Sequence, residues 1–366
     1  MHPLIITALY PPAVGGAASH FGQIAPELAR RDEIERVTVL TEVMPEQPGE
    51  LCQGKLRVLR RLPTRISLPQ RPWLWHALTY VLTQCWFAAH LPGLARRLGV
   101  DVIHFHTRYG GRLFYSSLRR CGVPVIADLH DKMTDPLELV GLADELLCCG
   151  EGVRRFALQA RFPAERIVLI PIPFERPEIP LPGQVATARK RYGLGGARYV
   201  LFVGDVTRNK GVYELLEAHR RWRSDHPGVL LVLAGTNREG DRFLAEIEAE
   251  GDVVYLGHVP HVDALTLIRG AEMLVLPSRS EGLPRVILEA LALGTKVICP
   301  PNIPEFERHL PTSVLGRVQV DAIGEMLDRV WEDTQVPAYP FDEHSLSRVV
   351  ERVSDVYARA VGRKRE

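Results

Sequence analysis

The segment Pro277–Pro300 (PSRSEGLPRVILEALALGTKVICP) constrains the fold of this 366-residue chain more than any other. An apolar run, Met273–Pro277, leads into it and has the character of a strand. Pro284 suits the first turn of a helix, where its missing N–H costs little, and Gly294 suits the end of that helix. Lys296–Cys299 then has the apolar character of a second buried strand. Strand, helix and strand in this order are typical of an α/β fold with a parallel sheet.

Two glutamates in this segment need an explanation. Glu281 stands where the strand gives way to the helix, and Glu289 lies within an otherwise apolar run. They are eight positions apart, and about two helical turns place them on similar faces. A carboxylate in apolar surroundings needs partners, because an unpaired buried charge is costly. The pair suits a hydroxyl-rich ligand; the alternative is a solvated cap glutamate plus a core glutamate paired with an arginine.

The whole string resembles the E-x7-E signature of retaining glycosyltransferases with the GT-B fold, specifically glycosyltransferase family 4. The match includes Glu281, Gly282, Leu283 and Glu289. The resemblance implies that Glu281 contacts the donor sugar and Glu289 the ribose of a nucleotide, with Gly282 and Leu283 also in the donor site. It also implies two Rossmann-like domains facing each other across a cleft, with a C-terminal helix crossing back to the first domain.

The bulk properties set broad bounds. At 366 residues the chain is long enough for about two domains. A net charge of +1 gives no indication of nucleic-acid binding. The six cysteines include no C-x-x-C pair, so we expect reduced thiols in a cytoplasmic protein rather than a disulfide framework. The N-terminus has no basic region or cleavage site typical of a signal peptide.

The N-terminal part begins with a candidate anion site. His2–Tyr10 has the nearly continuous apolar character of a buried parallel strand. A loop containing Gly16 follows it, and Ala17–Arg31 has helical periodicity. Backbone N–H groups at such a helix start can bind an anion, although a plain turn is the more common explanation of two adjacent glycines. The family resemblance implies that Gly16 approaches the donor phosphate or the acceptor.

Histidines follow or occupy several of the predicted strands. His130 ends the strand Val123–His130, at the edge where open α/β sheets bind ligands. A histidine there is often only hydrogen-bonded to a neighbouring loop, but the resemblance implies that His130 reaches the donor sugar. We expect His20, His104 and His106 to be structural.

The segment Leu51–Val100 contains no Asp or Glu and is rich in basic and aromatic residues. Such a composition suits an anionic membrane surface or an acidic acceptor, so peripheral membrane contact through 55–97 is one hypothesis. The alternative is a core helix, Leu74–Leu98, preceded by a solvated basic loop. Polar residues interrupt the apolar part, which argues against a transmembrane span. The residues concerned are Lys55, Arg57, Arg60, Arg61, Arg65, Arg71, Trp73, Trp75, Trp86, Phe87, Arg96 and Arg97.

Proline and glycine are concentrated between 171 and 196, which is typical of a domain boundary. We therefore expect an N-terminal domain over 1–174 that is completed by a helix at 342–366, a linker over 175–196, and a C-terminal nucleotide-sugar domain over 197–341.

After that boundary, the loop GDVTRNKG brings Arg208 and Lys210 to a helix start, where a diphosphate could bind. A basic loop is usually just solvated, but the resemblance implies that Lys210 contacts the donor phosphates. Many family members have arginine where this chain has Asp205, so Arg208 would supply the second positive charge. The resemblance also implies a nucleobase pocket near Val259.

These features predict a retaining, metal-independent glycosyltransferase without a cofactor. Its donor would be a nucleotide diphosphate sugar of UDP or GDP rather than ADP, and its acceptor a glycan or lipid-linked glycan of the cell envelope or an exopolysaccharide. We expect catalytic roles for His130, Lys210 and Glu281. No D-x-D motif is present to bind a divalent ion. The alternatives are a GT-B nucleotide-sugar epimerase and a non-catalytic nucleotide-binding descendant.

Overall fold

The computed structural model describes residues 1–13, 15–64, 72–107, 109–130, 136–248 and 251–365. The chain forms two compact units. Unit 1 comprises Met1–Pro173 and Asp342–Glu366, and unit 2 comprises Phe174–Phe341. The chain thus leaves unit 1 at Pro173 and returns to it for the last helix.

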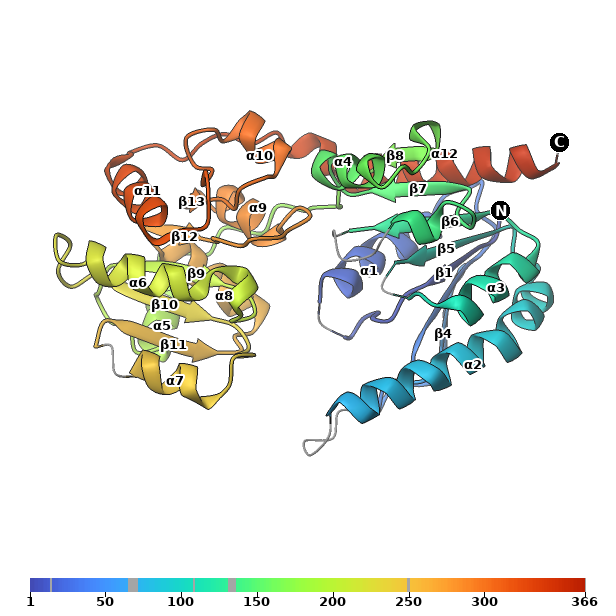
Figure 1. Ribbon diagram of the computed structural model, residues 1–366, viewed down its shortest axis with the longest axis horizontal. Helices are drawn as coiled ribbons and strands as arrows, with labels where there is room; N and C mark the ends of the chain where they lie inside the picture. Colours follow the sequence, from blue (N-terminus) through green and yellow to red (C-terminus); the bar gives the residue numbers. More distant parts are fainter. Residues whose placement is uncertain (14, 65–71, 108, 131–135, 249–250, 366) are drawn as a thin grey trace. The chain divides into compact units, whose positions relative to one another are not determined.

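Unit 1 is built on one sheet with the strand order β3-β4-β2-β1-β5-β6-β7-β8 (Figure 1). Neighbouring strands are parallel except β3 and β4, which pair antiparallel as a hairpin. The central strand β1 is buried along its whole length, which explains its continuous apolar sequence. The strands are β1 (Pro3–Ile6), β2 (Val37–Glu42), β3 (Glu50–Gln53), β4 (Leu56–Leu62), β5 (Val102–His106), β6 (Val125–Leu129), β7 (Glu145–Cys148) and β8 (Ile167–Leu169).

Helices cover both faces of this sheet. In β5, His104 bonds to Tyr357 of α12, whereas the ring of the next residue, Phe105, meets Phe114 of α3. Successive strand residues point to opposite faces, so α12 and α3 lie on opposite sides. Helix α1 packs beside α12, and α2 packs beside α3. The helices are α1 (Gly16–Leu28), α2 (Pro72–Leu98), α3 (Arg112–Cys121), α4 (Glu151–Gln159) and α12 (Leu346–Arg365), with short 3-10 turns at η1 (Pro136–Leu139) and η2 (Ala164–Arg166).

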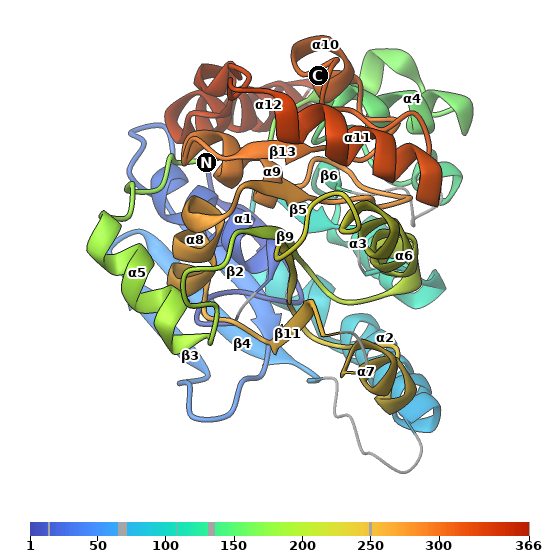
Figure 2. The same cartoon turned by 90° about the vertical axis from the view of Figure 1, so that its left-hand side faces the viewer.

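Unit 2 has a second, fully parallel sheet of order β11-β10-β9-β12-β13. Figure 2 gives a second view of its strands and helices. The strands are β9 (Tyr199–Val203), β10 (Leu230–Ala234), β11 (Val253–Gly257), β12 (Met273–Val275) and β13 (Lys296–Ile298). The helices are α5 (Pro182–Arg191), α6 (Val212–Trp222), α7 (Asp241–Glu248), α8 (His261–Gly270), α9 (Arg285–Ala292), α10 (Pro304–His309) and α11 (Val320–Glu332), with η3 (Arg208–Lys210) as a 3-10 turn. The 3-10 turn η4 (Phe341–His344) lies where the chain passes from unit 2 back to unit 1. The predicted α/β class with two parallel-sheet domains is confirmed.

Residues 175–196, which we expected to form a linker, belong to unit 2 and contain helix α5. Pro182 stands in the first turn of this helix, and the Leu181 backbone N–H donates to Gln184 Oε1 over 2.8 Å. Helix α5 then packs against α8. The prolines and glycines thus mark the ends of a helix rather than a flexible connection.

Candidate active site

In each sheet the strand order reverses at one point, and loops at the carboxyl ends of the strands there form the usual ligand site of open α/β folds. In unit 2 the reversal lies between β9 and β12, and in unit 1 between β1 and β5. The loops after β9 and β12 contain Arg208, Lys210, Glu281, Gly282 and Leu283. The other predicted site residues lie in α1, after β6, after β11 and in α9.

The loop after β9 is held by its own backbone and by the loop after β12. Thr207 Oγ1 accepts from the Lys210 N–H at 3.3 Å, which closes the turn η3. Gly211 has φ +71°, and a Cβ atom there would lie 2.2 Å from the Pro277 carbonyl oxygen. Only glycine allows this approach. The Arg279 N–H also donates to the Asn209 carbonyl at 2.8 Å, so the two loops are in direct contact.

This contact brings together Lys210 and Glu281. The Lys210 Nζ lies 2.5 Å from Glu281 Oε1, although the residues are 71 positions apart. The Lys210 side chain is 27% exposed and that of Glu281 14%. Both therefore remain within reach of a ligand. An ammonium group held in this way can attract phosphate oxygens, and a carboxylate can accept hydrogen bonds from sugar hydroxyls.

Glu281 does not open the helix as we expected. Helix α9 begins at Arg285, with Pro284 as its N-cap in extended conformation. Proline disfavours helical geometry in the residue before it, so Leu283 and Glu281 stay in the loop. The prediction that two helical turns separate Glu281 from Glu289 was therefore wrong. Glu281 lies in the loop before α9, and Glu289 lies within α9.

Glu289 lies on α9 with 12% of its side chain exposed and bonds to His261 Nε2 over 3.0 Å. This hydrogen bond raises the pKa of His261. Burial lowers the pKa of Arg285, while the charges of Glu289 and Glu175 oppose that effect. Glu289 is thus matched to positive neighbours, as a carboxylate in apolar surroundings requires.

The other predicted donor residues have varied surroundings. Arg208 is exposed, lies 4.1 Å from the Tyr213 ring centroid and 3.7 Å from Glu239, and its role at a diphosphate stays a prediction. Val259, which follows β11, and Leu283 are buried, each with 8% exposure. Gly282 belongs to the loop before α9.

At the start of α1 it is Gly15, not Gly16, that requires glycine. Gly15 has φ +145° and forms the N-cap of the helix, whereas a Cβ on Gly16 would meet no atom within 4 Å. Gly16 is exposed at the first helical position.

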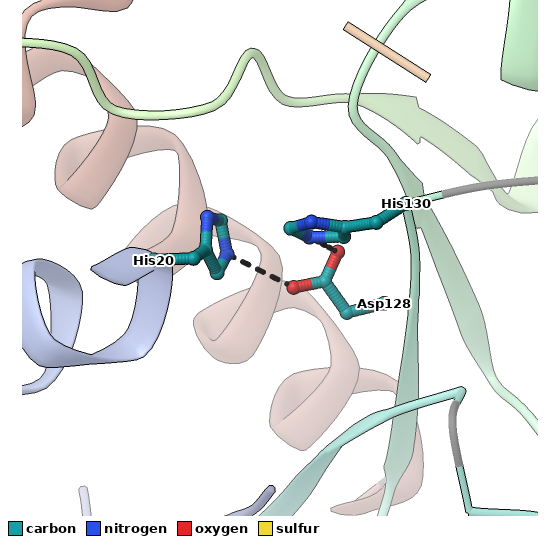
Figure 3. Close-up of side chains that lie close together, drawn as sticks. All are labelled: His20, Asp128 and His130. Atoms are coloured by element: carbon teal, nitrogen blue, oxygen red, sulfur yellow. Dashed lines mark hydrogen bonds and ion pairs between the residues drawn. The ribbon is translucent and has the colours of Figure 1, made fainter. Parts of the chain in front are cut away.

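Unit 1 places a carboxylate among histidines. Asp128, a buried residue within β6, lies 2.9 Å from His130 Nε2 and 3.1 Å from His20 Nε2 (Figure 3). His104 Nε2 lies 3.3 Å from the same carboxylate, and its Nδ1 bonds to the Tyr357 hydroxyl over 2.7 Å. His20 and His104 are both buried in this cluster. Asp128 was not among the predicted site residues, although an aspartate within the apolar strand VIADL is a signal of a functional or paired carboxylate.

The cluster is a buried carboxylate stabilised by imidazoles. Burial alone would raise the pKa of Asp128, but His130 and His20 hold it well below its usual range. Burial, followed by the charge of His130, lowers the pKa of His20 to about 4, although Asp128 opposes this. At neutral pH His20 is therefore an uncharged donor to an ionised Asp128.

The same atoms invite comparison with a metal site, because ligand atoms of His20, Asp128 and His130 lie within 4.8 Å of one another. Metal-binding histidines normally donate their second ring nitrogen to an acceptor. The Nδ1 of His20 is buried and has no hydrogen-bond partner among the described residues. Hydrogen bonds to Asp128 already explain the short distances, so we assign no metal here.

Comparison with known proteins identifies the family. The model for glycosyl transferases group 1 matches residues 185–339, and the model for glycosyltransferase family 4 matches residues 14–175. The chain belongs to the group 1 glycosyltransferases. The resemblance stated from the Glu281–Glu289 signature is thereby confirmed.

Solved structures show that this glycosyltransferase has the GT-B fold. A glycosyltransferase from Rickettsia africae superposes with a TM-score of 0.71 over 98% of both chains, at 13% identity. Anabaena HepE in complex with UDP and glucose superposes with a TM-score of 0.64 over 99% of this chain and 98% of that one, at 15% identity. The C-terminal helix α12 belongs to unit 1, as the resemblance implied.

Curated relatives match over shorter stretches. The O-antigen chain mannosyltransferase B of Escherichia coli is 31% identical over 180 residues, which are 47% of this chain and 45% of that protein. The chain spans between about a quarter and a half of the length of the first curated relatives that it matches. Their substrates are therefore not transferred to this glycosyltransferase.

Proposed function

We propose that the protein transfers a sugar from a nucleotide diphosphate sugar to a glycan or lipid-linked glycan, with retention of the anomeric configuration and without a metal ion. The observation that carries this proposal is the Lys210–Glu281 pair, held by backbone contacts between the two family motifs. Unit 2 would bind the donor, with UDP as the first candidate nucleotide because Anabaena HepE was solved with UDP and glucose.

The chemistry follows from the charges at these loops. Breaking the bond between the sugar and the diphosphate builds negative charge on the leaving phosphate. Lys210, with Arg208 and the backbone N–H groups of the loop before α6, would stabilise that charge in the transition state. The acceptor hydroxyl would attack the same face of the sugar, and the departing phosphate oxygen would take its proton. No separate general base is then needed.

Positioning is the second part of the proposal. Glu281 and the loop containing Gly282 and Leu283 would bind hydroxyls of the donor sugar, and Glu289 the ribose. His130 would contact the sugar as well, and Gly16 a phosphate or the acceptor. Holding the reacting atoms in a reactive geometry contributes to the rate independently of charge.

The first test is ligand-induced stabilisation. Of UDP, GDP and ADP, either UDP or GDP should raise the unfolding temperature. A ligand at about 100 times its Kd adds about 2.7 kcal/mol to the free energy of unfolding. Lys210→Ala should lower the affinity for this nucleotide by about 10- to 100-fold, since a charge-assisted contact is lost. Lys190→Ala, an exposed lysine on α5, is the matched control. Equal affinities in all three proteins would refute the diphosphate site.

Activity distinguishes the rival functions. Glu281→Ala should keep the nucleotide-dependent stabilisation but lose most transfer from a nucleotide sugar to a glycan acceptor. A sugar epimer formed without any acceptor would instead indicate an epimerase. Tight nucleotide binding with neither transfer nor hydrolysis would indicate a non-catalytic protein.

A further inference from the structure

Helix α2 has reversed polarity along residues 78–85. Thr79, Thr83 and Gln84 are buried against the rest of unit 1. Leu78, Val81 and Leu82 point outward and are 46%, 53% and 50% exposed. A helix that faces water shows the opposite arrangement, with its apolar stripe inward.

The rotation of α2 is fixed by hydrogen bonds of the inward polar groups. The Gln84 side chain donates to the Gly110 carbonyl at 2.7 Å and accepts from the Phe114 N–H at 3.1 Å. Thr83 donates to the Thr79 carbonyl at 2.7 Å. Turning the helix to bury its apolar stripe would leave these groups unpaired, which is costly. The outward position of the apolar residues is therefore built into the packing.

Helix α3 extends the exposed apolar surface. Leu113 on α3 is 46% exposed and Tyr80 on α2 is 53% exposed. The two helices touch here, because a Cβ on Gly111 would lie 2.3 Å from the Tyr80 hydroxyl. We define the α2–α3 apolar face as Leu78, Tyr80, Val81, Leu82 and Leu113.

Basic residues outnumber acidic ones around this face, although Glu138 accepts a hydrogen bond from the Tyr115 hydroxyl of α3. Between positions 51 and 127 the sequence contains a single acidic residue, Asp101, whose carboxylate accepts from the backbone N–H of His2. Among the described residues, the exposed arginines of α2 and α3 form no ion pair. Three of them, Arg96, Arg119 and Arg120, donate to backbone carbonyls. The set is Arg96, Arg97, Arg112, Arg119 and Arg120.

We propose that the α2–α3 apolar face docks on a lipid bilayer that contains anionic headgroups. Outward aliphatic side chains beside arginines without a carboxylate partner match the interfacial helices that lie on such surfaces. No helix among the described residues is long and apolar enough to cross a bilayer. A second copy of this chain fits poorly, because a twofold contact would set the arginines of one copy against those of the other.

The residues available for this membrane contact differ from those expected from the sequence of the segment 55–97. Arg57 and Arg61 of β4 pair with Glu50, and Arg60 donates to the Pro11 carbonyl. Phe87 is buried. Arg65, Arg71, Trp73 and Trp75 lie outside the residues or side chains described. Within the segment 55–97, the contact therefore belongs to α2 rather than β4, and α3 adds to it.

Vesicle flotation tests the proposal with the full chain and needs neither donor nor acceptor, so it is independent of the proposed transfer. Wild type should float with phosphatidylcholine vesicles that contain phosphatidylglycerol, and about tenfold less with pure phosphatidylcholine. Val81→Asp/Leu82→Asp should reduce flotation about tenfold, since two apolar contacts are replaced by charges. Val262→Asp in unit 2, where the side chain is 73% exposed, is the matched control and should float like wild type.

A charge-reversal variant tests the role of the arginines in the same flotation experiment. Arg97→Glu/Arg112→Glu should remove the preference for anionic vesicles and the sensitivity to salt. Unfolding temperatures check that each variant is folded. Wild-type protein that does not float, or an aspartate variant that floats like wild type, would overturn the proposal. A dimer in solution that Val81→Asp/Leu82→Asp dissociates would assign the face to a second copy instead.

Discussion

The ionisation of Asp128 depends on three imidazoles that come from three different elements. His20 is supplied by α1, His104 by β5 and His130 by the segment after β6. Removing one partner of a buried charge is more damaging than replacing both, because the remaining charge stays desolvated. The cluster therefore stabilises unit 1 only while the histidines keep their protonation state.

This gives a pH dependence. The pKa of His20 is about 4 in the folded protein, against 6.5 for an ordinary histidine. Below pH 6.5 the unfolded chain takes up a proton that folded His20 does not, so stability is full above pH 6.5 and falls towards pH 4. The loss is up to about 3 kcal/mol. Protonation of Asp128 lowers the stability further at more acidic pH, because the pKa of Asp128 is depressed in the folded protein.

Urea denaturation between pH 7 and about pH 4 measures this slope. His20→Gln keeps an N–H donor for Asp128 and should flatten the dependence, whereas the exposed His258→Gln should not change it. An unchanged slope in His20→Gln would contradict the assignment to His20.

At the level of elements, the loops of unit 2 are placed by backbone contacts rather than by side chains. A Cβ on Gly235 would lie 1.9 Å from the Gly204 carbonyl oxygen, just as Gly211 abuts Pro277. The loops after β9, β10 and β12 therefore stack directly on one another. This stacking explains how Lys210 and Glu281 meet without a covalent or metal link.

Two glycine substitutions separate close approach from backbone strain. Gly211 and Gly228 have similar φ values, +71° and +79°, but a Cβ on Gly228 would meet no atom within 4 Å. We expect Gly228→Ala to lower the free energy of unfolding by about 1 kcal/mol. Gly211→Ala should cost at least about 3 kcal/mol and weaken nucleotide binding, because the loop contact must open. Thermal unfolding and nucleotide titration measure both effects; equal losses would argue against the loop contact.

At the level of the whole molecule, α12 ties the end of the chain into unit 1. Val349, Val353, Val356 and Tyr357 of this helix belong to the same buried core as α1 and β1. Along the chain, unit 2 is therefore preceded and followed by segments of unit 1. Stability of unit 1 and ligand binding by unit 2 should be separable.

Tyr357→Ala tests that separation. Tyr357 is fully buried, so its truncation should lower the free energy of unfolding by about 3–5 kcal/mol. Nucleotide affinity at low temperature should remain near the wild-type value, because no donor residue of unit 2 is altered. The exposed Arg352→Ala on the same helix is the control. The prediction fails if stability is unchanged or if nucleotide affinity falls in parallel with stability.

The sequence by itself determined the α/β class, several of the buried strands and the family, and it singled out Lys210, Glu281 and His130 as candidate site residues. These signals are local: apolar runs, glycine positions and a contiguous motif can be read without knowing what lies nearby. The hairpin strand β3 was missed because it is exposed along its whole length and carries no apolar run. Helix α5 was missed because the proline and glycine residues at its ends indicated a linker more strongly than its interior residues indicated a helix.

Only the tertiary structure decided which polar groups meet. The pairing of Lys210 with Glu281 spans 71 positions and that of His20 with Asp128 spans 108, so no local pattern specifies either. The rotation of α2 was also decided by its neighbours. Hydrogen bonds to α3 turned Gln84 inward and Val81 outward, against the preference that hydrophobicity alone would give the helix.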